Sequence, residues 1–204
     1  MHRRAFLQSA AAASGLLLFP NPGRASQGCG QIVPTPMGPL QRCTAGVDSV
    51  RFQSAFQEED EWCWAASISM VFSYYGHPVS QTRIVAETWG QIVDMPAQPT
   101  DIIRDLNRTW VDDNGRRFQS IGDPTSANAF NAVVDLRNNQ PLIIGAFGHA
   151  TVLTALTADT NVQTGAWQIV EAVVRDPWPT NGARRVLSAQ EWMGISFAAR
   201  IRVI

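Results

Sequence analysis

Lysine is absent from this sequence, and all 16 basic residues are arginine. A lysine Schiff base, a P-loop lysine and a Ser-Lys dyad are therefore excluded. The 16 arginines nearly balance 17 aspartates and glutamates, so the chain lacks the basic excess that binds a phosphate backbone. Nucleic acid is not expected as a partner.

Metal-binding residues are scarce as well. The chain has three cysteines and three histidines, and neither a C-x-x-C nor an H-x-x-H spacing occurs. Structural zinc sites usually need four such ligands in closely spaced pairs. We therefore expect no metal, and no motif points to another cofactor.

The first 25 residues have the pattern of an export signal. Arg3 and Arg4 precede the soft apolar run 10–19, and small residues lead up to Ala25. This pattern predicts a twin-arginine signal peptide that is cleaved after Ala25. A membrane anchor is disfavoured, because the run is about half of the roughly 20 residues that span a bilayer. Cleavage would remove three arginines, leaving 13 basic and 17 acidic residues, a net charge of −4.

Export would place the cysteines in an oxidising compartment. Cys29 and Cys43 flank the proline- and glycine-rich segment 31–40, and we predict a disulfide between them in a leader over residues 26–50. Two free thiols are the alternative, because pairing cannot be read from sequence. Residues 51–204 are expected to form the main domain, in which Cys63 is the remaining thiol.

The pattern predicts helices first and strands later. Residues 60–75 are mostly apolar, follow a run of acidic residues and end at Gly76, which is typical of a buried helix. An α+β fold is expected, with a helical lobe leading into an antiparallel sheet lobe. Further helices are predicted at 82–89, 101–110 and 127–138, and strands at 142–147, 150–156, 166–175, 184–187 and 196–203, with a turn at 159–161.

Cys63 lies in the first turn of the predicted 60–75 helix. Free backbone N–H groups and the positive end of the helix dipole favour a thiolate there. Position alone is not decisive, because a free cysteine is more often a small buried apolar residue. A nucleophilic role requires a base within reach.

Elimination leaves one histidine for that role. His2 belongs to the predicted signal, and His77 lies 14 residues further along the helix. At about 1.5 Å per residue, His77 is roughly 21 Å from Cys63, too far for a hydrogen bond. His149 remains, at the start of a predicted strand. Its alternative role is that of a hydrogen-bonded core histidine.

An imidazole that serves as a base also needs a group that fixes its orientation. Asp176 directly follows the predicted strand 166–175 and precedes Pro177. Antiparallel pairing would bring Asp176 beside His149 at one end of the sheet. Two alternatives stay open: a turn-forming aspartate, or a salt bridge that occupies its carboxylate with Arg175.

These residues carry a resemblance to a known family. Gln57, Cys63-Trp64-Ala65-Ala66, Gly148-His149-Ala150 and Asp176-Pro177-Trp178 follow one another as in the papain-like cysteine proteases. They are most similar to the compact bacterial branch that includes secreted effector proteases. The resemblance spans residues 57–178 and implies a papain-like fold, with Cys63 as nucleophile, His149 as general base and Asp176 as its orienting group.

The resemblance also implies supporting roles. The Gln57 side-chain amide would form an oxyanion hole with the Cys63 backbone N–H. Gln53 is a less suitable donor, because its distance from Cys63 in the sequence does not match that of the family glutamine. Trp178 would shield the His149–Asp176 hydrogen bond from water. Trp64, like Trp62, is either a core residue or a substrate contact, and the core role is more common.

Departures from papain limit what can be transferred. Glu61 stands where papain has a second cysteine, and His149 and Asp176 follow the nucleophile more closely than the roughly 130 to 150 residues of papain. We therefore predict an exported cysteine peptidase, periplasmic or secreted, that hydrolyses peptide or isopeptide bonds of protein or peptide substrates through a Cys63 thioester. An acyltransferase, a deamidase and an inactive binding module are the alternatives, and an inhibitor or immunity protein is a partner to consider.

Overall fold

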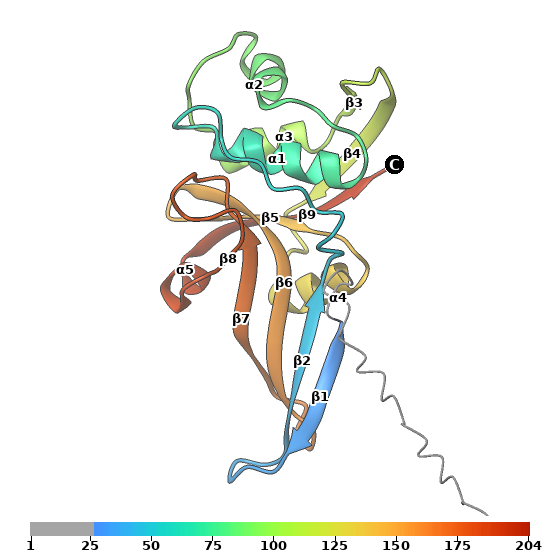
Figure 1. Cartoon of the computed structure of the whole chain (residues 1–204), viewed down its shortest axis with the longest axis vertical. Helices are drawn as coiled ribbons and strands as arrows, with labels where there is room; N and C mark the ends of the chain where they lie inside the picture. The colour runs from blue at the N-terminus through green and yellow to red at the C-terminus, as the bar shows by residue number, and fades with distance from the viewer. Residues whose placement is uncertain (1–26) are drawn as a thin grey trace, which may run out of the picture.

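The computed structural model describes residues 27–204, so the predicted signal peptide lies outside the described residues (Figure 1). Five helices occur in this part of the chain. None of them is long and apolar enough to cross a membrane. They are α1 (Cys63–Tyr74), α2 (Gln81–Trp89), α3 (Pro99–Asp105), α4 (Ala129–Arg137) and α5 (Ala189–Met193).

Nine strands form one sheet in which every pair is antiparallel. The main path runs β1-β2-β6-β5-β9-β4-β3, and β7 joins β6 to β8. The strands are β1 (Gly28–Val33), β2 (Leu40–Gly46), β3 (Thr109–Val111), β4 (Arg117–Asp123), β5 (Leu142–Ala146), β6 (His149–Asn161), β7 (Trp167–Arg175), β8 (Arg185–Val186) and β9 (Ile195–Val203).

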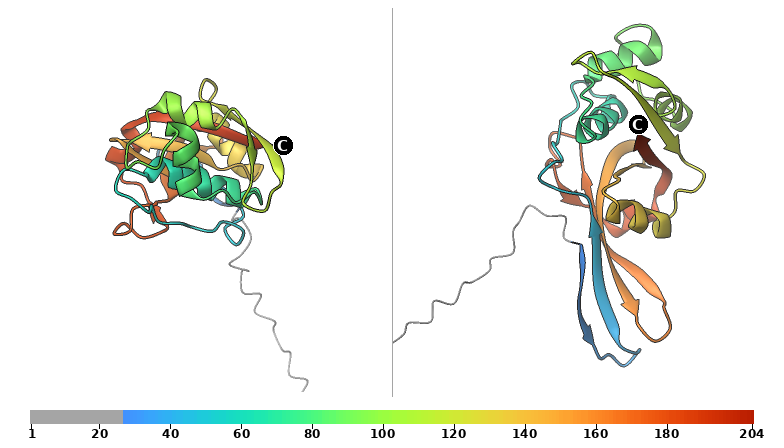
Figure 2. Two further views of the ribbon diagram at one scale, coloured as in Figure 1. Left: turned by 90° about the horizontal axis from the view of Figure 1, so that it is seen from above. Right: turned by 90° about the vertical axis from the view of Figure 1, so that its right-hand side faces the viewer.

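Strand β6 organises the sheet because it pairs with three others. Its first half pairs with β5, its second half pairs with β2, and β7 runs along most of its length. The far ends of β6 and β7 extend with β1 and β2 as a long ribbon, while α1, α2 and α3 lie at the opposite end of the molecule (Figures 1 and 2). The start of β6 therefore faces the helical part.

Helix α1 packs against α2 on one side and against the sheet on the other. Nine of its twelve residues are buried, and it packs against β6. Phe72 contacts Trp110 and Phe118 edge to face, which joins α1 to β3 and β4. This packing fixes the N-terminus of α1 against the first residues of β6.

The predicted α+β class is confirmed. The predicted order of helices before strands holds only in part, because β1 and β2 precede α1, and β3 and β4 precede α4. The 101–110 helix is wrong in its second half, because α3 ends at Asp105 and residues 109–111 form β3. Trp110 is buried there opposite Phe118 across the β3–β4 pair, and this packing outweighs local helix preference. The predicted turn at 159–161 is also wrong, since pairing with β2 and β7 extends β6 to Asn161.

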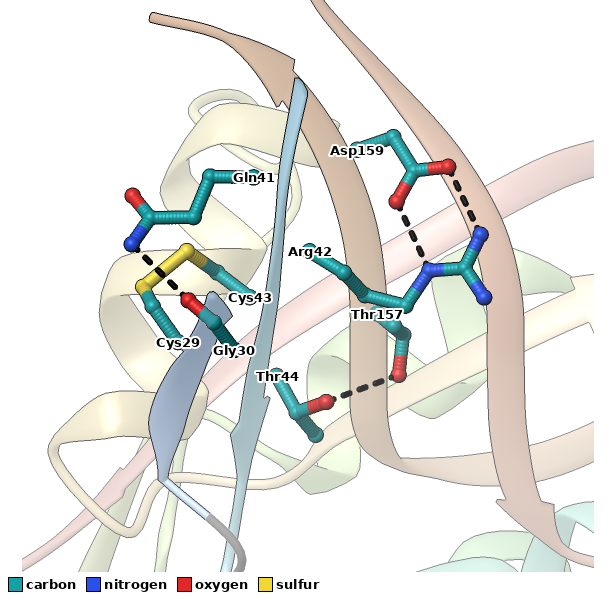
Figure 3. The surroundings of a disulfide bond; sticks show 8 residues. All are labelled: Cys29, Gly30, Gln41, Arg42, Cys43, Thr44, Thr157 and Asp159. Carbon is teal, nitrogen blue, oxygen red and sulfur yellow. Dashed lines mark hydrogen bonds and ion pairs between the residues drawn. A yellow bond between two sulfur atoms is a disulfide. The ribbon is translucent and has the colours of Figure 1, made fainter. Parts of the chain in front are cut away.

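The predicted disulfide is confirmed, and its surroundings are more regular than expected. Cys29 and Cys43 are joined across a β1–β2 hairpin, and β2 pairs with β6 over seven residues (Figure 3). Arg42 binds Asp159 through two hydrogen bonds of 2.7 Å, beside a contact between the hydroxyls of Thr44 and Thr157. Residues 28–46 are therefore built into the sheet.

Candidate active site

Cys63 is the first residue of α1, which begins three residues later than the predicted start at residue 60. Its N–H therefore has no acceptor within the helix. The backbone N–H of Ala150 donates to its sulfur at 3.5 Å, and Cys63 is the one free cysteine among the described residues. This contact joins the N-terminus of α1 directly to the start of β6.

His149 opens β6, immediately after the tight turn that follows β5. Its Nε2 lies 2.7 Å from Oδ1 of Asp176, which leaves Nδ1 as the ring nitrogen for Cys63. A hydrogen bond with Cys63 is among the interactions that raise the pKa of the ring. The predicted antiparallel pairing that brings His149 beside Asp176 is confirmed, because β6 and β7 are neighbours.

The Asp176 carboxylate is buried and receives four hydrogen bonds. His149 and the Trp178 backbone N–H bind Oδ1, the latter at 2.8 Å. Asn181 and Arg185 bind Oδ2, at 3.0 and 2.6 Å. The expected competitor Arg175 instead donates to Ser54 and lies over the ring of Phe52.

The electrostatics of this pair follow from the contacts. Burial lowers the pKa of His149, but the hydrogen bonds and charges of Asp176 and Cys63 outweigh it and raise that pKa to about 9. Burial acts in the opposite direction on Asp176, yet its hydrogen bonds hold the pKa of the carboxyl well below its usual range. These contacts favour the protonated form of the imidazole and the ionised form of the carboxylate.

The two tryptophans predicted as supporting residues have different surroundings. Trp178 meets the His149 ring edge to face, with 6.2 Å between ring centroids, so it covers one side of the imidazole. Trp64 is 1% exposed and donates its indole N–H to the Met95 carbonyl. Trp62 is held in the same way by the Val93 carbonyl. Trp62 and Trp64 thus anchor the segment that precedes α3, as core residues.

Gln57 is placed differently from the predicted oxyanion donor. Its side-chain N–H groups donate to the carbonyls of Glu59 and Asp60 at 2.9 and 2.6 Å. These two acceptors fix the orientation of the amide, because the reverse orientation would set three oxygens against one another. Its Oε1 is buried without a partner among the described residues. In this arrangement Gln57 shapes the segment that leads to Cys63.

Two hollows meet at Cys63 and His149, with volumes of about 660 and 330 Å³. The larger one is bordered by charged groups and by aromatic rings. The smaller one is bordered mostly by uncharged groups. The larger hollow is lined by Asp60, Glu61, Phe147, Trp178, Arg185 and Glu191, and the smaller by Trp64, Pro96, Gln98, Ile102, Ser196 and Phe197.

Other candidate groups do not join this site. His77 lies 3.0 Å from Asp112 and stacks on Phe118, so the structure agrees with its elimination as the base. Within residues 27–204 no three His, Cys, Asp or Glu side chains converge as a metal site requires.

Arg185 and its partner Glu191 were not among the site residues predicted from the sequence. One local signal was present, since Ser188 and Glu191 have the spacing of a capping box and do form one at the start of α5. That signal could have predicted α5. The contact of Arg185 with Asp176 has no local signature, because it depends on the pairing of β8 with β7.

A helix-borne cysteine, a histidine at a strand start and a buried aspartate, set between a helical part and an antiparallel sheet, define the class of papain-like cysteine proteases. The chain belongs to this family: the family model described as papain-like cysteine protease AvrRpt2 matches residues 45–193. None of the curated proteins compared with the chain matches it.

Several solved structures are similar to the chain at low sequence identity. A double glycine motif protease from an AMS/PCAT transporter, solved with its leader peptide, is 16% identical, with a TM-score of 0.47, over 78% of this chain and 96% of that one. The peptidase domain of Streptococcus ComA is 14% identical, with a TM-score of 0.49, over 74% and 97%. UfSP from C. elegans is 17% identical, with a TM-score of 0.42, over 84% and 34%.

Proposed function

We propose that this protease cleaves peptide or isopeptide bonds of protein or peptide substrates through a thioester on Cys63, with His149 as acid and base and Asp176 as the orienting group. The observation that carries the proposal is that the Cys63 sulfur lies at the start of β6, bound by the N–H of the residue after His149, while the His149 ring binds a buried carboxylate. This arrangement places the nucleophile, the base and the orienting group in the sequence that nucleophilic catalysis requires.

The Cys63 thiolate attacks the substrate carbonyl, and a C–S bond forms while the carbonyl oxygen becomes negative. Protonated His149 gives its proton to the departing nitrogen, the C–N bond breaks and an acyl-enzyme thioester remains. Neutral His149 then takes a proton from water, which attacks the thioester carbon and releases the acid and the thiolate.

The negative oxygen needs donors. The Cys63 N–H is suited to this role as a free group at the helix start. Gln57 is the proposed second donor, and it can act only if one of its bonds to the carbonyls of Glu59 and Asp60 is released. Gln57→Ala should lower kcat by about 10²-fold if the amide reaches the oxyanion. A change in thermal stability without a change in kcat would leave Gln57 with a structural role only.

The proposal is tested with a peptide library, with products identified by mass spectrometry. Cys63→Ala and His149→Ala should both abolish cleavage while thermal unfolding stays cooperative. His77→Ala is the matched control and should cleave at the rate of the parent chain. Cleavage that survives in Cys63→Ala would overturn the proposal.

The same experiment separates the related reactions, which share the thioester. Hydrolysis yields a free acid, and acyl transfer yields a product joined to an added amine. Deamidation increases the mass of a glutamine-containing peptide by about one mass unit without chain cleavage. An acyltransferase or deamidase would give the second or third product in excess. A binding module would retain peptides without any of them.

We also infer that the chain is exported. The Cys29–Cys43 disulfide supports this, because such bonds persist mainly in oxidising compartments. Changing Arg3 and Arg4 together to lysine should retain the protein inside the cell if the twin-arginine route is used. Unchanged export of this variant would show that the protein does not use the twin-arginine route. An inhibitor or immunity protein stays a prediction.

A further inference from the structure

The two oxygens of Asp176 have different partners. Oδ1 binds His149 Nε2 at 2.7 Å, and Oδ2 binds Arg185 Nε at 2.6 Å. The aspartate side chain has no exposed area, while His149 and Arg185 have a quarter and a fifth of theirs. Charges at this depth are screened less by water than surface charges.

Arg185 is held from its far side as well. Its two terminal nitrogens bind the Glu191 carboxylate at 2.7 and 3.1 Å. That carboxylate also accepts from the Ser188 backbone N–H at 2.8 Å, in the capping box that begins α5. The guanidinium is therefore fixed between two carboxylates and cannot swing away from Asp176 without breaking these contacts.

The result is a line of alternating charge: Glu191 negative, Arg185 positive, Asp176 negative and the His149 ring positive when protonated. A buried carboxylate by itself holds an imidazolium proton strongly. The proposed reaction needs that proton to leave for the departing nitrogen, and later needs a neutral ring to accept one from water. A cation on the other oxygen weakens the hold of the carboxylate.

We propose that Arg185 is a positioning residue of this protease that acts through Asp176, offsetting the charge of the carboxylate so that the proton on His149 remains transferable. The inference rests on the roles proposed above for His149 and Asp176. The other titratable groups that line the same hollow as the ring are Cys63 from α1, Asp60 and Glu61 from the segment before it, and Glu191 from α5.

The inference is tested by NMR titration of the histidine rings in the full chain. A Cys63→Ala background prevents thiol titration from overlapping with that of the ring. The chain has only three histidines, so single substitutions assign their signals. His77, which lies in its own cluster with Asp112 and Arg116, serves as an internal reference.

Arg185→Gln removes a positive charge and should raise the pKa of His149 by about one pH unit. Glu191→Gln removes a negative charge and should lower it. Both variants break the same ion pair. If this only loosened the structure, the pKa of His149 would shift in the same direction in both. Opposite shifts in the pKa of His149, with an unchanged titration of His77, identify the electrostatic effect.

One further variant makes the test decisive. Arg185→Lys keeps the charge and should leave the pKa of His149 within a few tenths of a unit of the parent value. If Arg185→Gln does not fold, Glu191→Gln carries the test alone. A lower or unchanged pKa in Arg185→Gln, or a higher or unchanged one in Glu191→Gln, would overturn the inference.

The titration needs no turnover, so it is separate from the test of the proposed function. Opposite shifts without any peptide cleavage would sustain the role of Arg185 in setting the His149 proton and would reject the proposed hydrolysis. In the active chain, Arg185→Gln should also move the acidic limb of the kcat profile to higher pH while kcat/KM at that limb changes little, because water attack on the thioester requires the neutral ring and follows acylation.

Discussion

The aromatic ring of Phe147 covers Gly194 so closely that a methyl group at residue 194 would stand 2.8 Å from its Cε2. Phe147 and Gly148 form the two-residue turn between β5 and β6, with φ of 53° and 79°. Asparagine followed by glycine is the favoured pair in such turns, and a bulky residue with positive φ is an outlier. This strained position lies two residues before His149.

Replacing Phe147 by asparagine should therefore stabilise the fold. The ring is 66% exposed, so little burial is lost, and relief of the backbone strain should raise the free energy of unfolding by about 1 kcal/mol. Urea unfolding measures the change. Phe130→Asn is the matched control, because Phe130 is 65% exposed on α4 and should give no gain. A less stable Phe147→Asn would contradict the prediction.

Gly194→Ala should have the opposite effect. Gly194 has φ of −85°, which alanine adopts freely, so the cost is steric. Forcing the Phe147 ring aside should lower the free energy of unfolding by about 1–3 kcal/mol. In a Phe147→Asn background the cost should shrink, because the two residues are in contact and their effects do not add. Strict additivity in the double-mutant cycle would mean that the ring does not hold this position in solution.

The Cys29–Cys43 disulfide should contribute to stability, because it closes a loop between residues 14 apart. Replacing both cysteines by serine should lower the free energy of unfolding by about 2–4 kcal/mol. Reductant should lower the thermal midpoint of the parent chain and leave the serine variant unchanged. Cys63→Ser serves as a control and should respond to reductant as the parent does. An equal midpoint with and without reductant would count against the bond.

The pH profile of peptide cleavage should have its basic limb near pH 9. His149 donates a proton to the departing nitrogen only while the ring is protonated, and its pKa is raised to about 9. Activity, measured as kcat/KM, should therefore be retained up to about pH 8 and fall tenfold per pH unit well above 9. His77→Ala should leave this limb in place. A rate that still rises at pH 10 would contradict the assignment.

Much of the site could be predicted because its signals are local. The position of Cys63 at a helix start, of His149 at a strand start and of Asp176 at a strand end can each be read from a few neighbouring residues. Apolar periodicity and breakers such as Gly76 and Pro177 mark these boundaries. Few histidines and no lysines then left one choice of base.

Tertiary structure alone decided the partners of these residues. The pairing of β8 with β7 selects Arg185 over the adjacent Arg175 as the cation on Asp176. The backbone carbonyls of Glu59 and Asp60 accept the hydrogen bonds of the Gln57 amide. Within the predicted leader, residues 40–46 form a strand because they pair with β6. Helix and strand ends follow from short-range preferences in the sequence, whereas which buried charge meets which depends on strand register and packing between residues far apart in the chain.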